Sequence, residues 1–263
     1  MLRFTSCQAQ VAESFCKALT EYMARKLEVS AEFVGDIPWQ LREPMFDRGE
    51  IHVCWMCGLP YVRKRDARQA NAELVAAPVM RDARYGGRPV YFSDVVVHTE
   101  STFSAFDDLR GATWAYNEPG SHSGYNMVRY HLATRGMDGQ YFGRIVESGS
   151  HQESLLMILE RSIDEAAIDS TVLEMVSTSN RSLSAQLRTI AVLGPSPAPP
   201  CLVHRSVPRD IRRSLREQFL SMQKDPEGRR ILEDAGVLQF VEVSDCDYNP
   251  IREMDWVARA IEW

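Results

Sequence analysis

Short apolar segments alternate with amphipathic segments along the first part of this chain of 263 residues. Residues 2–6 are typical of a strand, and residues 11–27 carry apolar side chains at the spacing of one helical face. Strands expected at 28–34 and 51–55 enclose a short helix at 39–46, which begins after a proline. Alternation of this kind predicts an α/β fold with mostly parallel sheets flanked by helices.

Composition excludes several classes of protein. The formal net charge of −6 disfavours nucleic-acid partners, which usually meet a basic face. No run approaches the ~18 apolar residues that a transmembrane helix needs. The length allows one large domain or two small ones.

The strand-to-helix junction at residues 117–125 stands out, because it joins an apolar segment at 112–116 to an amphipathic run at 125–132. The first amides of a helix have no partner within the helix. Together with the hydroxyls of Ser121 and Ser123 they could seat a tetrahedral oxyanion. The alternative is that a serine simply caps the helix.

Two further junctions carry similar side chains. Residues 148–151, Ser-Gly-Ser-His, precede a helical run, and a short strand ends at Asp169 and Ser170 before another helix. Ligands of open α/β sheets bind outside the carboxyl ends of the strands. Hydroxyl, imidazole and carboxylate groups from the three junctions could therefore converge on one small polar molecule.

Over nearly its whole length the chain resembles the phosphonate-, phosphite- and phosphate-binding solute receptors of ABC importers, which have the type II periplasmic-binding-protein fold. The segments that carry this resemblance are 84–85, 88–94, 108–111, 117–125, 148–151, 166–171, 194–197 and 248–252. No single segment is specific to the family, but the combination is.

The resemblance implies two lobes, each a mostly parallel sheet flanked by helices. Residues 1–93 and 191–263 would form the first lobe, and residues 94–190 would form the second, which carries the oxyanion site. Two crossover strands, near 91–97 and 187–193, would act as hinges for closure around a ligand held between the lobes.

In the second lobe the family's oxyanion site falls on Ser121, His122, Ser123 and Gly124. His122 occupies a position that is more often small in the family, so it either adds a donor or points to solvent. His151 matches a histidine that touches the same oxyanion, and a charged imidazolium there would supply the positive group that the acidic chain lacks.

Asp169 matches the family's cleft carboxylate, which would hold a ligand ammonium group or accept a proton from a protonated oxyanion. The alternative is that Asp169 or Ser170 caps the following helix, and the two roles are compatible.

Aromatic side chains of the first lobe would close over the ligand. Tyr91, within one of the matching segments, is the strongest candidate. Trp39 and Trp55 are also candidates, although the core is the favoured place for either one alone.

These features predict the solute-binding component of an ABC importer that takes a small phosphorus oxyanion and works as a monomer with an ABC permease. We expect no catalytic residue, cofactor or metal. The alternatives are a small-molecule enzyme on the same fold, although no G-x-S-x-G motif is present, or a ligand-sensing domain.

The resemblance implies a periplasmic or extracytoplasmic location. The chain begins directly with a strand and shows no signal-peptide pattern, which leaves the cytoplasm as the alternative.

Six cysteines are spread along the chain, and Cys54 and Cys57 have C-x-x-C spacing. Because no second ligand pair or redox-motif context accompanies them, buried thiols are the expected interpretation. Whether Cys54 and Cys57 ever pair stays open.

Overall fold

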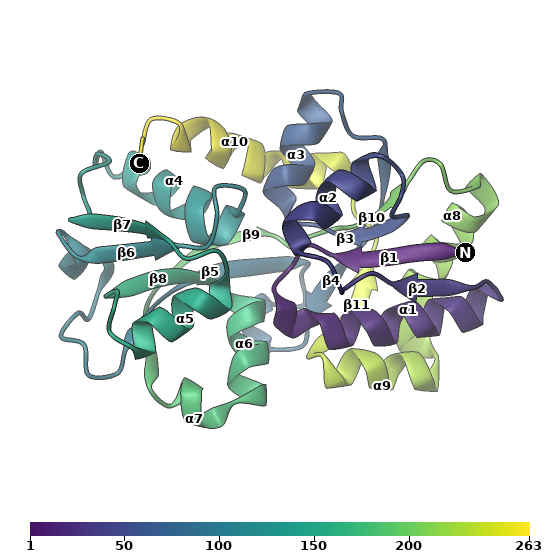
Figure 1. Ribbon diagram of the computed structural model, residues 1–263, viewed down its shortest axis with the longest axis horizontal. Coiled ribbons are helices and arrows are strands. Elements are labelled where there is room, and N and C mark those ends of the chain that lie inside the picture. The colour runs from purple at the N-terminus through teal and green to yellow at the C-terminus, as the bar shows by residue number, and fades with distance from the viewer. The chain divides into compact units, whose positions relative to one another are not determined.

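The computed structural model describes residues 1–263. The chain divides into two compact units, and helices lie on both sides of the strands in each (Figure 1). The first unit comprises Met1–Val90 and Pro197–Asn249, and the second comprises Tyr91–Ser196 and Pro250–Trp263. The predicted α/β class with sheets flanked by helices is confirmed.

The first unit is built on a six-stranded sheet in the order β11-β4-β10-β3-β1-β2. β1 pairs in parallel with β2 and β3, whereas β10 runs antiparallel to β3 and β4. Its strands are β1 (Leu2–Ser6), β2 (Ala31–Phe33), β3 (Val53–Trp55), β4 (Ala72–Met80), β10 (Cys201–His204) and β11 (Val237–Val241). Its helices are α1 (Glu13–Leu27), α2 (Trp39–Asp47), α3 (Gly58–Asp66), α8 (Arg209–Ser221) and α9 (Pro226–Asp234).

The second unit has a five-stranded sheet in the order β7-β6-β8-β5-β9. β6 pairs in parallel with both β7 and β8, and β5 runs antiparallel to β8. Its strands are β5 (Val90–His98), β6 (Thr113–Tyr116), β7 (Arg144–Glu147), β8 (Glu165–Asp169) and β9 (Leu187–Pro197). Its helices are α4 (Met127–Thr134), α5 (His151–Leu159), α6 (Ser170–Ser179), α7 (Arg181–Ser184) and α10 (Asn249–Ala258). No helix of the chain combines the length and apolar content that crossing a bilayer requires.

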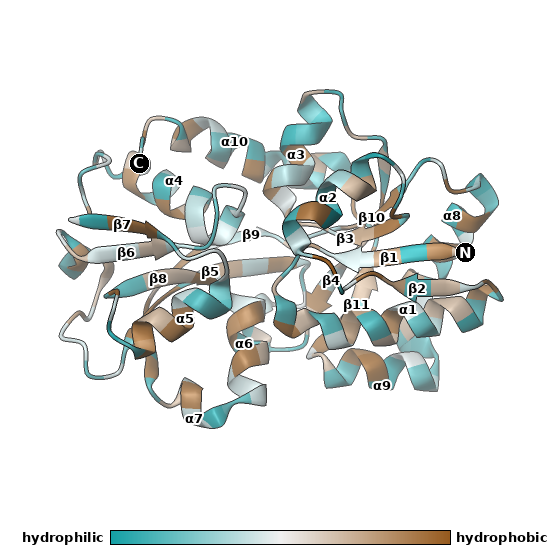
Figure 2. Ribbon diagram, in the orientation of Figure 1, coloured by the Kyte–Doolittle hydropathy of each residue, from teal (hydrophilic) through white to brown (hydrophobic).

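Amphipathic helices bury one side against the sheet of the first unit. On α1 the residues at helical spacing, from Phe15 to Met23, are buried, and Phe15 stacks on Phe240 and meets Trp55 edge-on. Figure 2 shows hydrophobic and hydrophilic residues alternating along α1 and α9, as expected for helices with one buried face.

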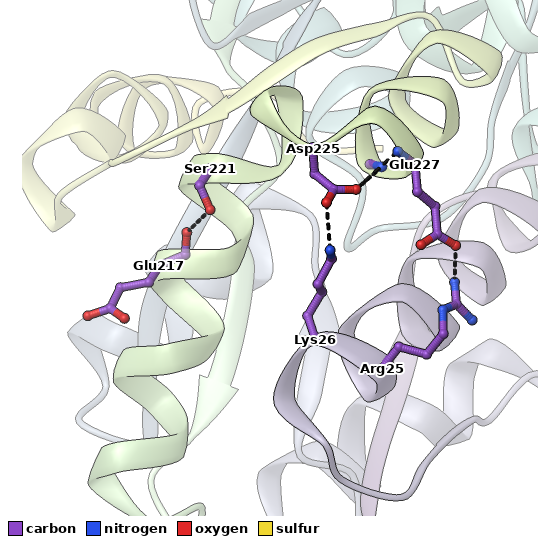
Figure 3. A network of polar contacts seen from close by, with 7 residues as sticks. Arg25, Lys26, Glu217, Ser221, Asp225 and Glu227 are labelled. Carbon is purple, nitrogen blue, oxygen red and sulfur yellow. Dashed lines mark hydrogen bonds and ion pairs between the residues drawn. The ribbon is translucent and has the colours of Figure 1, made fainter.

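The end of α1 is tied to the start of α9 by opposite charges (Figure 3). Lys26 Nζ lies 2.5 Å from an oxygen of Asp225, and Arg25 pairs with Glu227. The other oxygen of Asp225 accepts hydrogen bonds from the first amides of α9. Basic side chains therefore lie at a helix C-terminus and acidic ones at a helix N-terminus, which suits both helix dipoles.

The C-terminal segment, Pro250–Trp263, belongs to the second unit. It was expected in the first lobe, with the rest of residues 191–263. Ile261 and Trp263 pack with Trp114 in the apolar core of this unit, and Arg129 donates a 2.8 Å hydrogen bond from Nε to the carbonyl of Ile261. A Cβ on Gly139 would lie 2.1 Å from the carbonyl oxygen of Glu262, so only glycine permits this close approach. The apolar residues that end the chain find their core here, which sequence order did not indicate.

A buried acid lies at the start of β8. Glu165 is fully buried, opposite Val97 of β5 and beside Trp114 of β6, and neither carboxyl oxygen has a hydrogen-bond partner. Burial, assisted by the neighbouring charge of Asp164, raises the pKa of Glu165 well above its usual value. Glu165 is therefore protonated in the folded protein at pH values where it is ionised in the unfolded chain.

The raised pKa of Glu165 makes stability fall as the pH rises from the ordinary glutamate pKa toward the folded value, because the unfolded chain releases this proton first. In Glu165→Gln, melting temperatures measured from pH 5 to pH 8 should decline less than in the wild type, by at least about 2 °C. The exposed Glu160→Gln is the control and should keep the wild-type slope. Equal slopes for Glu165→Gln and wild type would contradict the assignment.

Candidate functional site

Parallel pairing of β6 with β7 and β8 brings the three predicted junctions to one edge of the sheet. The carboxyl ends of the strands are Tyr116, Glu147 and Asp169, and each is followed within a few residues by a helix. The segments at 117–125, 148–151 and 169–171 therefore start from the same edge, as the strand pattern predicted.

At the first junction Ser121 caps the helix. Its Oγ accepts a hydrogen bond from the amide of Gly124 at 3.0 Å, and the first turn, His122–Asn126, is a π-helix that leads into α4. The hydroxyl of Ser121 is thus engaged in capping, the alternative that the sequence left open. A contact between Ser121 and a ligand stays a prediction.

Ser123 and His151 meet across two junctions. The Oγ of Ser123 lies 3.1 Å from Nε2 of His151, and both residues are buried. His151 is the first residue of α5, where Ser150 caps the helix by accepting from the amide of Glu153 at 3.0 Å. Capping by Ser150 therefore fixes the start of α5 so that the imidazole of His151 contacts Ser123 at the start of the neighbouring helix.

Gly124 and Asn117 complete this cluster. A Cβ on Gly124 would lie 2.1 Å from Oδ1 of Asn117 and 3.2 Å from Cε1 of His151. Oδ1 of Asn117 and Nδ1 of His151 are both buried without a hydrogen-bond partner. Each such atom lowers the stability of the fold by about 1–3 kcal/mol unless a ligand or water forms a hydrogen bond with it. These two atoms therefore mark a place where a polar ligand could bind.

Asn117 was not among the sequence candidates, although it lay within the segment that drew attention. The signal was its position directly after the strand 113–116, the place where cleft residues of α/β sheets occur. What sequence could not reveal is that its amide packs against Gly124 and leaves no room for a side chain there.

The expected imidazolium at His151 requires correction. Burial lowers the pKa of His151 to about 4, since no acidic neighbour offsets the loss of solvation. At neutral pH the ring is therefore uncharged and offers one N–H donor rather than a full positive charge.

His122 neither points to solvent nor forms part of the Ser123–His151 pair. The ring is fully buried, with Nε2 3.0 Å from Oγ of Ser196 and Nδ1 3.2 Å from Nδ2 of Asn126. The ring centroid of Tyr91 lies 6.3 Å away. These contacts tie the helix start to β9, so His122 has a structural role whatever it does toward a ligand.

Asp169 and Ser170 organise the third junction. Asp169 caps α6 by accepting hydrogen bonds from the amide and the hydroxyl of Thr171, at 2.8 and 2.7 Å. Ser170 accepts a hydrogen bond from the amide of Phe92 at 3.0 Å. Burial raises the pKa of Asp169 to about 6, against the opposing hydrogen bonds from Thr171 and with a further rise from Asp94. The capping alternative is therefore realised at Asp169, and ligand contact by either residue stays a prediction.

The aromatic candidates are divided between the units. Tyr91, which was expected in the first lobe, begins the second unit and is buried. Trp55 is buried in the first unit, where its Nε1 donates to the carbonyl of Pro199 at 2.9 Å, as its core interpretation required. Trp39 starts α2 of the first unit and is half-buried.

The structure thus groups Asn117, Ser123, Gly124 and His151 tightly, and it places Asp169 and Ser170 at the same sheet edge. No group of three or more His, Cys, Asp or Glu side chains has the arrangement of a metal site. Helix-start amides, a hydroxyl and a neutral imidazole form a donor set suited to a small anion.

A two-unit α/β protein with such a cluster at its strand ends is typical of solute-binding proteins. The family model for the periplasmic substrate-binding protein of phosphonate ABC transporters matches residues 4–248, and the chain belongs to this family. The resemblance seen in the sequence is thereby confirmed.

One relative is the phosphonates-binding periplasmic protein of Escherichia coli (strain K12). It is 25% identical over 239 residues, which cover 88% of this chain and 68% of that protein.

Two solved structures share the fold, each with a TM-score of 0.85 and 18% sequence identity. One is a binding-protein component of an ABC phosphonate transporter from Pseudomonas aeruginosa, with 98% of this chain and 86% of that chain covered. The other is PhnD1 from Prochlorococcus marinus in complex with methylphosphonate, with 99% and 98% covered.

The lowered pKa of His151 predicts its behaviour in solution. In carbon–proton NMR spectra of the ligand-free protein, the Cε1–H resonance of His151 should keep its neutral-form position from pH 8 down to about 5 and shift only as the pH approaches about 4. The resonance is assigned by its loss in His151→Ala. A His151 midpoint near 6.5 would contradict burial as the cause.

Proposed function

We propose that this chain binds a small phosphorus oxyanion, with a phosphonate as the favoured ligand, and passes it to an ABC permease. The observation that carries the proposal is the contact of 3.1 Å between Ser123 and His151 at the start of two helices. Membership in the phosphonate family supports the ligand class.

The chemistry of the donors fits a tetrahedral oxyanion. Helix-start amides supply directed hydrogen bonds, and hydrogen bonds to a charged acceptor contribute about 1.5–3 kcal/mol each. Nε2 of the neutral His151 ring would accept the hydroxyl hydrogen of Ser123, so the buried, unpartnered Nδ1 would carry the single N–H and donate it to a ligand oxygen. The net charge of −6 then matters little, because recognition depends on local dipoles.

Asp169 would contact a further polar group of the ligand. Since its pKa is raised to about 6, it is mostly ionised at neutral pH. A carboxylate at this sheet edge can hold an ammonium group or accept the proton of a singly ionised phosphonate. Tyr91, Trp39 and Trp55 remain candidates for contact with an organic substituent.

A double substitution tests the oxyanion donors. Ser123→Ala with His151→Ala should weaken methylphosphonate binding by at least about 10-fold in isothermal titration calorimetry, because the hydrogen bond from the His151 ring to a charged group is lost together with the serine that orients the ring. Circular dichroism should show a retained fold.

The matched control makes the same two substitutions elsewhere in the second unit, Ser162→Ala with His98→Ala, and should keep the wild-type affinity. If the test variant binds as tightly as the control, these residues do not hold the oxyanion. If neither the wild type nor any variant binds phosphonate, phosphite or phosphate, the ligand class is wrong.

Closure on the ligand, which the resemblance implies, is a further prediction. Saturating methylphosphonate should lower the radius of gyration measured by small-angle X-ray scattering, because hinge closure makes a two-lobed protein more compact. The double variant Ser123→Ala with His151→Ala, measured at the same ligand concentration, should show no change. An unchanged radius in the wild type under conditions where calorimetry shows saturation would argue against closure.

We propose binding without turnover. Ser123 and His151 have the spacing of a nucleophile and a base, but Nδ1 of His151 has no partner, whereas a catalytic histidine is oriented by a third group. A pKa of about 4 also makes His151 a weak base at neutral pH. These two features favour a receptor over the alternative of an enzyme.

Family membership supports a periplasmic place of work and an ABC permease as partner. We propose that the chain acts there as a monomer.

A further inference from the structure

Two thiols of the first unit lie in contact. Sγ of Cys7 is 3.6 Å from Sγ of Cys54, although the two residues are 47 positions apart. The sequence had raised only the pair Cys54–Cys57, because of its C-x-x-C spacing. The fold instead sets Cys54 against a cysteine from the neighbouring strand.

Strand pairing brings these two thiols near each other. β1 and β3 are parallel, with Thr5 opposite Cys54, and the amide of Cys7 donates to the carbonyl of Trp55 at 2.9 Å. A disulfide needs a sulfur–sulfur distance of about 2.05 Å. The sulfur atoms therefore have to approach by about 1.5 Å for the bond to form.

The two thiols differ in access. Cys54 is completely buried, whereas Cys7 is partly exposed just beyond the end of β1. Burial and the neighbouring Cys7 raise the pKa of Cys54, so its thiol stays protonated and does not react first. The more accessible Cys7 is therefore the thiol that meets a small disulfide. The remaining buried thiols, Cys16 and Cys201, have pKa values that burial also raises, to about 12 for Cys16.

We propose that Cys7 and Cys54 form a redox-responsive pair that closes to a disulfide and staples β1 to β3. The Cys7 thiolate attacks a low-molecular-weight disulfide, which forms a mixed disulfide and releases one thiolate. Cys54 then gives up its proton and attacks Sγ of Cys7, and the second small thiolate leaves. Overall, two protein thiols are oxidised to one disulfide, and one small disulfide is reduced to two small thiols, which take up the two protons.

The new bond would close a loop that contains α1, β2 and α2. A cross-link of this span lowers the conformational entropy of the unfolded chain far more than that of the folded chain, because the strands are already adjacent in the sheet. Oxidation should therefore raise the melting temperature by roughly 5–10 °C.

The experiment treats the chain of residues 1–263 with oxidised glutathione under native conditions, blocks the remaining thiols with a maleimide in denaturant and maps cross-linked peptides by mass spectrometry. Cleavage after Glu13 separates Cys7 from Cys16, and cleavage after Trp55 separates Cys54 from Cys57. We expect a Cys7–Cys54 peptide and a higher melting temperature that dithiothreitol reverses.

Two variants sharpen the result. Cys57→Ser should still form the cross-link and gain stability, whereas Cys7→Ser should do neither under the same oxidation. A Cys54–Cys57 or Cys7–Cys16 cross-link, a stable glutathione adduct on Cys7 without closure, or closure without a rise in melting temperature would each overturn the proposal. Because the peptide map is made on the wild type, the test stands even if Cys7→Ser folds poorly.

Discussion

Parallel pairing of three short strands is the constraint on which the rest of the second unit depends. Because β6 pairs with β7 on one side and β8 on the other, three chain segments leave the sheet at the same edge. The donors of Ser123 and His151 come from two of these segments, and Asp169 comes from the third. If the strands were paired in another order, the same residues would be scattered, and the polar cluster would not exist.

Burial, rather than net charge, determines the electrostatics of this edge. Burial keeps His151 neutral and raises the pKa of Asp169 to about 6. At the opposite end of β8, burial also raises the pKa of Glu165. An anion bound there, as we propose, would meet helix-start amides and the uncharged ring of His151. On the proposed site the phosphorus oxyanion would therefore be held by preorganised dipoles rather than by a cationic side chain.

Sequence reasoning predicted the α/β class, the three junctions and the family, because hydrophobic periodicity and short motifs are local properties. It could not decide between capping and ligand contact at Ser121 and Asp169, since both roles use the same side-chain oxygens. It placed residues 250–263 with the first lobe, whereas Ile261 and Trp263 pack in the second unit. It also missed Asn117, whose importance lies in its contact distance to Gly124.

The sequence by itself determined that strands and helices alternate and which side chains stand at the three junctions, because these depend on neighbours within a few residues. Only the tertiary structure decided that Ser123 meets His151, that the imidazole is uncharged, and that Cys54 faces Cys7 rather than Cys57. The physical reason is that distance and solvation are set by strand order and packing between segments far apart in the chain.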